Sequence, residues 1–253
     1  MNILVCAKRV PMTGGRIVLT PDEQSIETRH LGFTISPHEE CGVEEAVRLI
    51  EQHGGETTVL TLGPPEAEEQ LRDAMALGID RAILLQVDTE WEPQATAAAI
   101  LEAIEAERAA GTEYDLIIFG NESADAGNFQ VGIRVAHALG RPIVTGVKGI
   151  SVTDGKVRAE QEVPSGRDIY EVPMPAVLTV KEGLNLPRYP SVPGRLRAKR
   201  KPLETKTPTA GRPGLEKVRL VLPPGEGKQT QVLGEGAAAA PAVLEVLKQA
   251  GVV

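Results

Sequence analysis

The stretch YDLIIFGNESADAGNFQVGIRVAHALG, residues 114–140, decides the fold, because it joins a buried strand to an amphipathic helix through a polar loop. The predicted strand, Tyr114–Phe119, ends in four consecutive apolar residues, which is typical of a parallel strand covered on both faces. From Gly127 to Leu139 the apolar residues recur at helical spacing, and Gly140 is a typical helix stop. The stretch therefore predicts a strand, a loop and a helix in that order.

The same alternation extends along the first part of the chain. Apolar or β-branched runs predict strands, and apolar residues at helical spacing predict helices. This rhythm favours a doubly wound, mainly parallel α/β sheet of Rossmann-like type, with right-handed crossovers that place helices on both faces. The predicted strands are 3–7, 57–62, 81–87 and one that starts at 143, and the other predicted helices are 39–53, 65–77 and 93–110.

The rhythm changes after about residue 146. The Asp154-Gly155 pair between two alternating segments predicts a late β-hairpin, and a strand at 176–180 follows Pro175, which suits a strand start or an edge. Beyond residue 183, prolines, glycines and charges dominate until an amphipathic segment at 241–253. We therefore expect an α/β domain at 1–183 and an extended C-terminal arm at 184–253, which ends in a helix and embraces a partner.

Composition argues against several classes of protein. A net charge of −8 over 253 residues disfavours general nucleic-acid binding, which needs a positive surface. Two cysteines, Cys6 and Cys41, argue against a disulfide framework and fit a reducing cytoplasm. No apolar run approaches the ~20 residues that cross a bilayer, and the first residues lack the pattern of a signal peptide. We expect a cytoplasmic protein that does not insert into membranes.

The loop at 120–132 is the main candidate for a ligand site. It follows a buried strand and opens a helix, at the carboxyl edge where α/β sheets bind ligands. Free N–H groups at the helix start, with Gly127 allowing close approach, suit a phosphate. The loops at 7–13, 36–39 and 62–64 are expected at the same edge, where the four loops together could form a nucleotide-sized cleft. The alternative, a polar connection capped by Asp125 or Asn128, stays open.

Other chemical motifs are weak. The sequence has no P-loop string, and the G-x-G-x-x-A match at 234–239 leaves too little chain for a βαβ unit, so we interpret it as a linker. The four histidines lack the spacing of a zinc site. Cys6, inside a strand, is interpreted as a core residue. The pairs Glu44-Glu45 and Glu68-Glu69 are interpreted as solvated helix faces. We expect no catalytic residue and no metal ligand.

The segment 181–201 reverses the charge of the chain. It holds seven cations against the single acid Glu182, a net +6 that leaves −14 for the remainder. Such a reversal indicates a surface for an acidic partner. Within it, the proline-bracketed segment 187–193 would hold Val192 outward as an apolar anchor. A solvated linker with incidental charges is the alternative interpretation.

These segments together resemble the electron-transfer flavoprotein beta family, over most of the chain. No single segment is decisive, but five in the family's order are specific. They are Leu4–Val10, Val43–Leu49, Ala74–Arg81, Asp125–Gly132 and Leu184–Pro193 with the basic run after it.

The resemblance implies a non-enzymatic electron carrier. Such a subunit pairs with an alpha subunit that holds most of the FAD; acyl-CoA and related dehydrogenases donate electrons, and a membrane quinone oxidoreductase accepts them. The beta subunit itself holds a structural AMP. By position, the resemblance places nucleotide contacts at Cys6, Ala7, Ser36, Pro37, His38, Glu39, Leu62, Gly63, Gly120, Asn121, Glu122, Ser123, Asp125, Gly127, Asn128, Phe129, Gln130 and Val131. It places dehydrogenase docking at Val192, with Tyr189, Arg195, Arg197 and Arg200.

Several alternatives remain at this stage. Flavin-bifurcating members hold a second FAD in the AMP cleft; we favour AMP because Phe129, Ile133 and Arg134 would crowd a larger ligand. Thr13 and His38 stand where many members have an aromatic residue that could approach the flavin, so this departure leaves open whether Thr13 or His38 contacts the flavin. A stand-alone adenine-nucleotide sensor or hydrolase is a second class of function, ranked lower because the P-loop is missing. An RNA-binding adaptor lacks aromatic platforms, since aromatics make up 3% of the chain.

Overall fold

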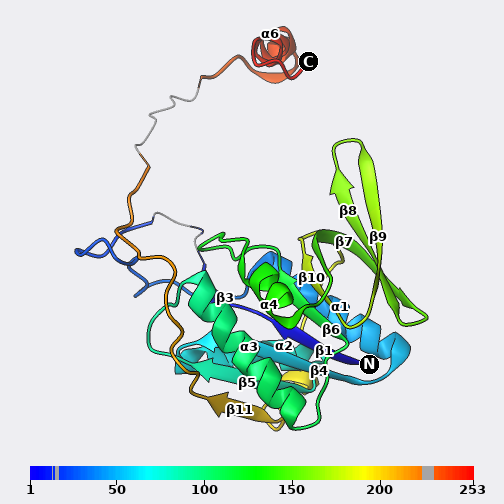
Figure 1. Cartoon of the computed structure of the whole chain (residues 1–253). Helices are drawn as coiled ribbons and strands as arrows, with labels where there is room; N and C mark the ends of the chain where they lie inside the picture. The colour runs from blue at the N-terminus through cyan, green and yellow to red at the C-terminus, as the bar shows by residue number, and fades with distance from the viewer. Residues whose placement is uncertain (13, 15–16, 224–230) are drawn as a thin grey trace. The chain divides into compact units, whose positions relative to one another are not determined.

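A computed structural model describes residues 1–12, 14, 17–223 and 231–253, in two compact units, Met1–Val218 and Arg219–Val253. The described part of the first unit contains a nine-stranded sheet in the order β11-β5-β4-β1-β6-β10-β7-β8-β9 (Figure 1). Its strands are β1 (Asn2–Cys6), β4 (Glu56–Gly63), β5 (Arg81–Gln86), β6 (Leu116–Gly120), β7 (Ile143–Thr153), β8 (Lys156–Val163), β9 (Gly166–Pro173), β10 (Ala176–Val180) and β11 (Leu203–Lys206).

Helices flank this sheet on both faces, as the doubly wound prediction requires. They are α1 (Pro37–His53), α2 (Glu68–Leu77) after a short 3-10 turn η1 (Pro65–Ala67), α3 (Pro93–Ala109) and α4 (Val131–Leu139). A further helix, α5 (Val192–Ala198), packs against α2. A small separate pairing joins β2 (Val10–Pro11) to β3 (Phe33–Thr34). The fold class expected from the sequence is confirmed.

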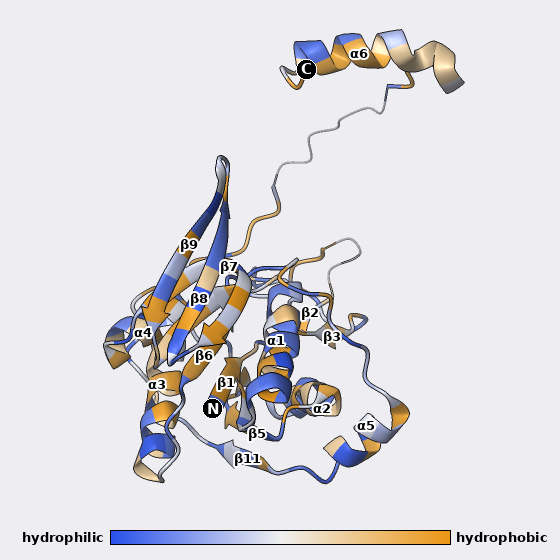
Figure 2. Cartoon of the chain, turned by 90° about the vertical axis from the view of Figure 1, so that its right-hand side faces the viewer, coloured by the Kyte–Doolittle hydropathy of each residue, from blue (hydrophilic) through white to orange (hydrophobic). Residues whose placement is uncertain are grey.

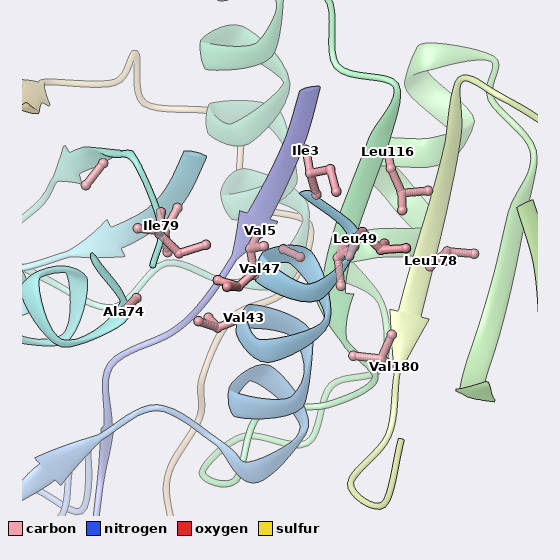
Figure 3. Close-up of a cluster of buried hydrophobic side chains, with 14 of the residues drawn as sticks. Ile3, Val5, Val43, Val47, Leu49, Ala74, Ile79, Leu116, Leu178 and Val180 are labelled. Carbon is pink, nitrogen blue, oxygen red and sulfur yellow. The ribbon is translucent and has the colours of Figure 1, made fainter. Parts of the chain in front are cut away.

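Two hydrophobic cores lie on opposite faces of the sheet. Because successive strand residues point to opposite faces, Ile3 and Val5 of β1 pack toward α1 and α2, whereas Leu4 and Cys6 pack toward α3 and α4. Figure 3 shows Val43 and Val47 of α1 lying over the β1 side chains. Figure 2 shows that hydrophobic residues dominate the central strands of the sheet, whereas the β8–β9 ribbon is largely hydrophilic.

The strand order reverses at β1. From β1 the chain continues to β4 and β5 on one side and then returns to β6 on the other, and all of these strands are parallel. Cys6 at the end of β1 lies opposite Phe119 near the end of β6. A crevice forms at such a switch point because the two connections leave in opposite directions.

Several local expectations need correction. Helix α4 begins at Val131, not at Gly127, because Gly127 and Phe129 adopt left-handed backbone conformations with φ of 55° and 57°. Strand β10 lies in the interior of the sheet between β6 and β7, so Pro175 marks a strand start and not an edge.

The late hairpin forms as the Asp-Gly pair predicts. Strands β7 and β8 pair antiparallel around Asp154 and Gly155, whose φ angles of 49° and 73° are those of a tight hairpin turn. The sequence does not predict β9, which extends the hairpin to an antiparallel ribbon.

The sheet also extends beyond residue 183. Strand β11 pairs parallel with β5, and Thr209 bonds to Glu102 of α3, so the first compact unit continues to Val218. The domain boundary predicted from the sequence, at residue 183, therefore lies inside this unit and not at its end. In the second unit, a 3-10 turn η2 (Gly236–Ala239) leads into α6 (Ala240–Gln249), the terminal helix that the sequence predicts. Among the described helices of the chain, none is both long and apolar enough to cross a bilayer.

Candidate functional site

The loops after β1 and β6 meet at the switch point through a buried carboxyl group. Glu39, in the first turn of α1, is 5% exposed. Its Oε1 accepts a hydrogen bond from the Lys8 backbone N–H at 3.1 Å, and its Oε2 accepts one from the Ser36 N–H at 3.0 Å. A side chain on Gly120 would not fit beside it, because a Cβ there would lie 2.7 Å from the Glu39 Cγ. Glu39 therefore fixes the β1 loop, the start of α1 and the end of β6 against one another.

The same carboxyl group has an unusual affinity for protons. Burial raises the pKa of Glu39 to about 8, against the hydrogen bonds from Ser36 and Lys8, which lower it. Cys6 lies at the end of β1, directly before this loop, and is 5% exposed. Burial raises the pKa of its thiol well above the usual range, so Cys6 is an unreactive core residue, as expected.

Two polar contacts tie the 120–130 loop to this framework. The Ala124 N–H donates to the Ser36 Oγ at 2.9 Å. The Lys8 ammonium lies 2.6 Å from Asp125 and 2.7 Å from Glu90. Although burial opposes it, the Lys8 charge lowers the pKa of Asp125. Asp125 is therefore an ionised anchor of the loop.

Asn121 fixes the other side of the loop. Its side-chain oxygen accepts hydrogen bonds from the Thr179 hydroxyl at 2.8 Å and from the Gly146 N–H at 3.0 Å. Its own backbone N–H donates to the Val180 carbonyl. Asn121 thus joins the end of β6 to the end of β10 and to Gly146 within β7, which is a structural role for a residue predicted to contact the nucleotide.

The start of α4 fits a phosphate. Gln130 at its N-cap position accepts no capping hydrogen bond from the helix, because its side-chain oxygen instead accepts from the Arg134 guanidinium at 3.0 and 3.2 Å. A nine-residue helix whose first N–H groups lack a side-chain cap presents donors and a positive dipole end. Gly127 and Phe129, in left-handed conformations, lie in the loop directly before this helix start. The residues present therefore fit the phosphate end of a nucleotide.

The other residues predicted to contact the nucleotide lie in three places. Leu62 and Gly63 end β4, so they lie at the same sheet edge one strand away from β1. Pro37 and His38 lie in the first turn of α1; Pro37 is exposed, and His38 is partly buried with an Nδ1 that has no partner among the described residues. Glu122, Ser123 and Asn128 lie within the 120–130 loop, and Val131 is the first residue of α4. Thr13 lies outside the described residues.

Sequence patterns do not reveal some of the residues that organise this site. Lys8 lies inside one of the predicted loops, and its only signal in the sequence is its position directly after the first predicted strand. Glu90, Thr179 and Gly146 lie outside the predicted loops. These three residues come from distant parts of the chain, and no local pattern marks them.

The proposed docking residues lie on and beside α5. Val192 is the first residue of this helix and is 73% exposed, and Tyr189 before it is 95% exposed. Ser191 caps the helix by accepting from the Gly194 N–H at 3.1 Å. Val192 thus projects from a helix start and not from a loop, but it is held outward as expected.

The segment before α5 is held by acids that we expected to be solvated. Glu44 and Glu45 on α1 are buried. Both Glu44 oxygens accept from Arg188, at 2.9 and 3.1 Å, and Glu45 accepts from Asn185 at 2.9 Å. The interpretation of this acid pair as a solvated helix face is therefore wrong, whereas Glu68 and Glu69 are exposed.

Some of the basic charge of segment 181–201 is used internally. Arg188 also pairs with Glu51, and Arg195 pairs with Asp73 at 2.6 Å. Arg197, Lys199 and Arg200 make no ion pair with any carboxylate of the described residues, and all three are exposed. An uncompensated positive surface remains around the exposed side of α5.

Comparison with known proteins gives the decisive observation. A family model described as the electron transfer flavoprotein domain matches residues 25–210. The chain belongs to the electron transfer flavoprotein family. Within this family it is 33% identical to the electron transfer flavoprotein subunit beta of Bacillus subtilis, with 98% of both chains covered. It is 35% identical to the subunit beta of Thermoanaerobacterium thermosaccharolyticum, with 92% of this chain and 86% of the relative covered.

A third relative carries a different name. The caffeyl-CoA reductase-Etf complex subunit CarD of Acetobacterium woodii is 33% identical, with 80% of this chain and 77% of the relative covered. Together these matches confirm the beta-subunit family expected from the sequence. Membership in this family implies an electron-transfer role and a heterodimer with an alpha subunit.

Proposed function

We propose that this chain is the AMP-holding beta subunit of a heterodimeric electron carrier whose FAD is held mostly by the alpha subunit. In this proposal, acyl-CoA and related dehydrogenases donate electrons, and a membrane quinone oxidoreductase accepts them. The single observation that carries the nucleotide assignment is the junction of three loops around Glu39 at the switch point, beside the uncapped start of α4.

The roles of this chain's residues follow from that geometry. The first N–H groups of α4 would bind the phosphate, with Gly127 allowing the approach. Cys6, Ala7 and Leu62, at the ends of two adjacent strands, offer strand-end backbone and apolar surface to the adenine. Glu39, Asn121 and Ser36 would act by positioning the loops. Bound FAD supplies the electron chemistry, and no residue of this chain is proposed to make or break bonds.

The class of the partner enzyme has separate support. Among the relatives, CarD is named as a subunit of a complex with a caffeyl-CoA reductase, so one relative associates with an oxidoreductase of a CoA thioester. The exposed apolar residue Val192 with its unpaired cations is suited to a protein partner with an acidic rim.

A second candidate is a bifurcating carrier with a second FAD in place of AMP. The similarity to CarD is the observation that supports it. We favour AMP because Phe129, Ile133 and Arg134, in and directly after the loop before α4, would crowd a larger ligand. A stand-alone sensor or hydrolase is disfavoured, since the family members named here are subunits.

Nucleotide extraction from the purified heterodimer tests the proposal. One FAD and one AMP per heterodimer are expected. Two FAD and no AMP would replace the proposal with the bifurcating alternative, and a chain that binds neither a partner nor a nucleotide would overturn both.

A further inference from the structure

The carboxyl group of Glu39 lies next to a chain of charged side chains at the switch point. Its Oε1 accepts from the Lys8 backbone N–H at 3.1 Å, and the Lys8 ammonium contacts Asp125 at 2.6 Å and Glu90 at 2.7 Å. Asp125 belongs to the loop before α4, where the phosphate of the proposed nucleotide would bind. A single residue, Lys8, therefore connects Glu39 to the charged part of the crevice.

The positive charge of Lys8 is already shared by two acids. Although burial lowers it, the charges of Glu90 and Asp125 raise the pKa of Lys8, so its side chain stays an ammonium at neutral pH. One ammonium beside two carboxylates leaves a net charge of −1. An ionised Glu39, which is 5% exposed, would add a second negative charge that this group cannot neutralise.

The other titratable groups around Glu39 supply little positive charge. Cys6 ends β1, and burial raises the pKa of its thiol, which stays neutral. Glu122 is an acid in the loop before α4, and a Cβ on Gly127 would lie 3.7 Å from its Oε2. His38 precedes Glu39 on α1, and its Nδ1 has no partner among the described residues. Of these groups His38 alone could become positive, so a variant of His38 belongs in any test.

A negative charge in the loop before α4 acts on Glu39. Burial is the main reason why the pKa of Glu39 is raised to about 8; the hydrogen bonds from Ser36 and Lys8 and the Lys8 charge lower it, and the Asp125 carboxylate raises it. A phosphate at the start of α4 would bring further negative charge to the same region. Like charges favour the neutral form of a carboxyl group, so the phosphate would hold the proton on Glu39 more tightly.

We propose that the switch-point crevice takes up a proton together with its nucleotide, and that the Glu39 carboxyl carries this proton. This inference rests on the proposed function and adds a dependence on pH to it. The coupling is reciprocal, because a ligand that tightens proton binding is itself bound more tightly by the protonated site. The crevice therefore holds its nucleotide most firmly while Glu39 is neutral and releases it more readily as the pH rises. Glu39 is a positioning residue in this scheme.

The test measures AMP binding by the heterodimer, after removal of its bound AMP, with titration calorimetry between pH 7.5 and pH 9. A phosphate monoester loses its second proton near pH 6, so the titration of AMP itself contributes little in this range. The Kd should rise about fourfold from pH 7.5 to pH 9, for a coupling factor of about ten. At pH 8, buffers of different ionisation enthalpy should report uptake of a fraction of a proton.

Two variants identify the group that carries the proton. Glu39→Gln should bind AMP with an affinity that does not change across this range, because glutamine does not titrate. Glu69→Gln, on the exposed face of α2, is the matched control and should keep the pH dependence of the wild type. His38→Gln should also keep this dependence, whatever its affinity for AMP. If Glu39→Gln does not form the heterodimer, the proton uptake of the wild type and of His38→Gln decides the question.

The outcomes separate the inference from the function beneath it. A wild type that binds AMP with a constant affinity and takes up no proton would overturn the inference and leave the proposed function standing. A Glu39→Gln variant that keeps the pH dependence, or a His38→Gln variant that loses it, would also overturn the inference, because another group would then carry the proton. A heterodimer that binds no AMP at any pH would overturn the proposed function and the inference with it.

Discussion

The substitution Glu39→Gln is expected to reverse its effect on stability as the pH rises. Both oxygens of this buried carboxyl accept backbone N–H groups, from Lys8 at 3.1 Å and from Ser36 at 3.0 Å. A glutamine offers one oxygen and one amino group, so one of these N–H groups loses its acceptor. An unsatisfied buried donor costs about 1–3 kcal/mol. At pH 5 the variant should therefore be less stable than the wild type.

The wild type loses folding stability as the pH rises, because Glu39 must then give up its proton inside the folded protein. Because the pKa of Glu39 is raised to about 8 from its ordinary value of 4.5, the folded state holds this proton more tightly than the unfolded state does. The stability that this proton contributes is fully present below pH 4.5 and is lost as the pH rises through 8, at about 1.4 kcal/mol per pH unit and about 5 kcal/mol in total at most. Glutamine does not titrate, so above pH 8 the variant should be the more stable of the two.

Thermal unfolding of the heterodimer between pH 5 and pH 9 measures this crossing. Each kcal/mol corresponds to a few degrees of Tm for a chain of this size. Glu69→Gln on the exposed face of α2 is the control, and its Tm should run parallel to that of the wild type at every pH. If the wild type and Glu39→Gln curves also run parallel, the burial of Glu39 does not raise its affinity for the proton, and the reasoning is refuted.

Three further changes probe the loops and the docking segment. Gly120→Ala should deplete the heterodimer of AMP, because its Cβ would lie 2.7 Å from the Glu39 Cγ; a full AMP content on extraction would contradict this. Arg188→Ala should lower the free energy of unfolding by about 1–3 kcal/mol, since it leaves the buried Glu44 with one cation fewer, and a Tm equal to that of the wild type would refute the role of this pair. Val192→Glu should weaken reduction by a dehydrogenase while gel filtration still shows the heterodimer; equal loss of both would assign the segment to assembly.

The central sheet is predictable because its signals are local. Runs such as Leu116–Phe119 are apolar without interruption, and the helices between them keep a regular apolar spacing, so a few residues suffice to indicate each element. The position of the crevice follows from the order of these elements. The start of α4 is predicted too early, because Gly127 and Phe129 take left-handed conformations that no apolar pattern encodes.

Helix α5 escapes prediction for a physical reason. Its buried positions are Gly194 and Ala198, which are small, while its large apolar residues Val192 and Leu196 face outward. The hydrophobic pattern is thus the reverse of the one that a packed helix normally shows. Strand β11 is equally hard to predict, because its four residues are added to an edge of the sheet.

The polar framework of the site is the least predictable part. Glu44 is buried because Arg188 lies beside it, 144 residues further along the chain, and Asn121 is satisfied by Thr179, 58 residues away. Propensity and spacing carry no information about such partners. The same limit explains why the acid pair on α1 resembles a solvated face in the sequence.

The ratio of FAD to AMP extracted from the purified heterodimer decides whether the switch-point crevice holds AMP. One of each is expected in the wild type, with the AMP lost in Gly120→Ala and the FAD retained. A heterodimer that yields two FAD and no AMP, or whose AMP content is indifferent to Gly120→Ala, would contradict the assignment of this crevice to AMP.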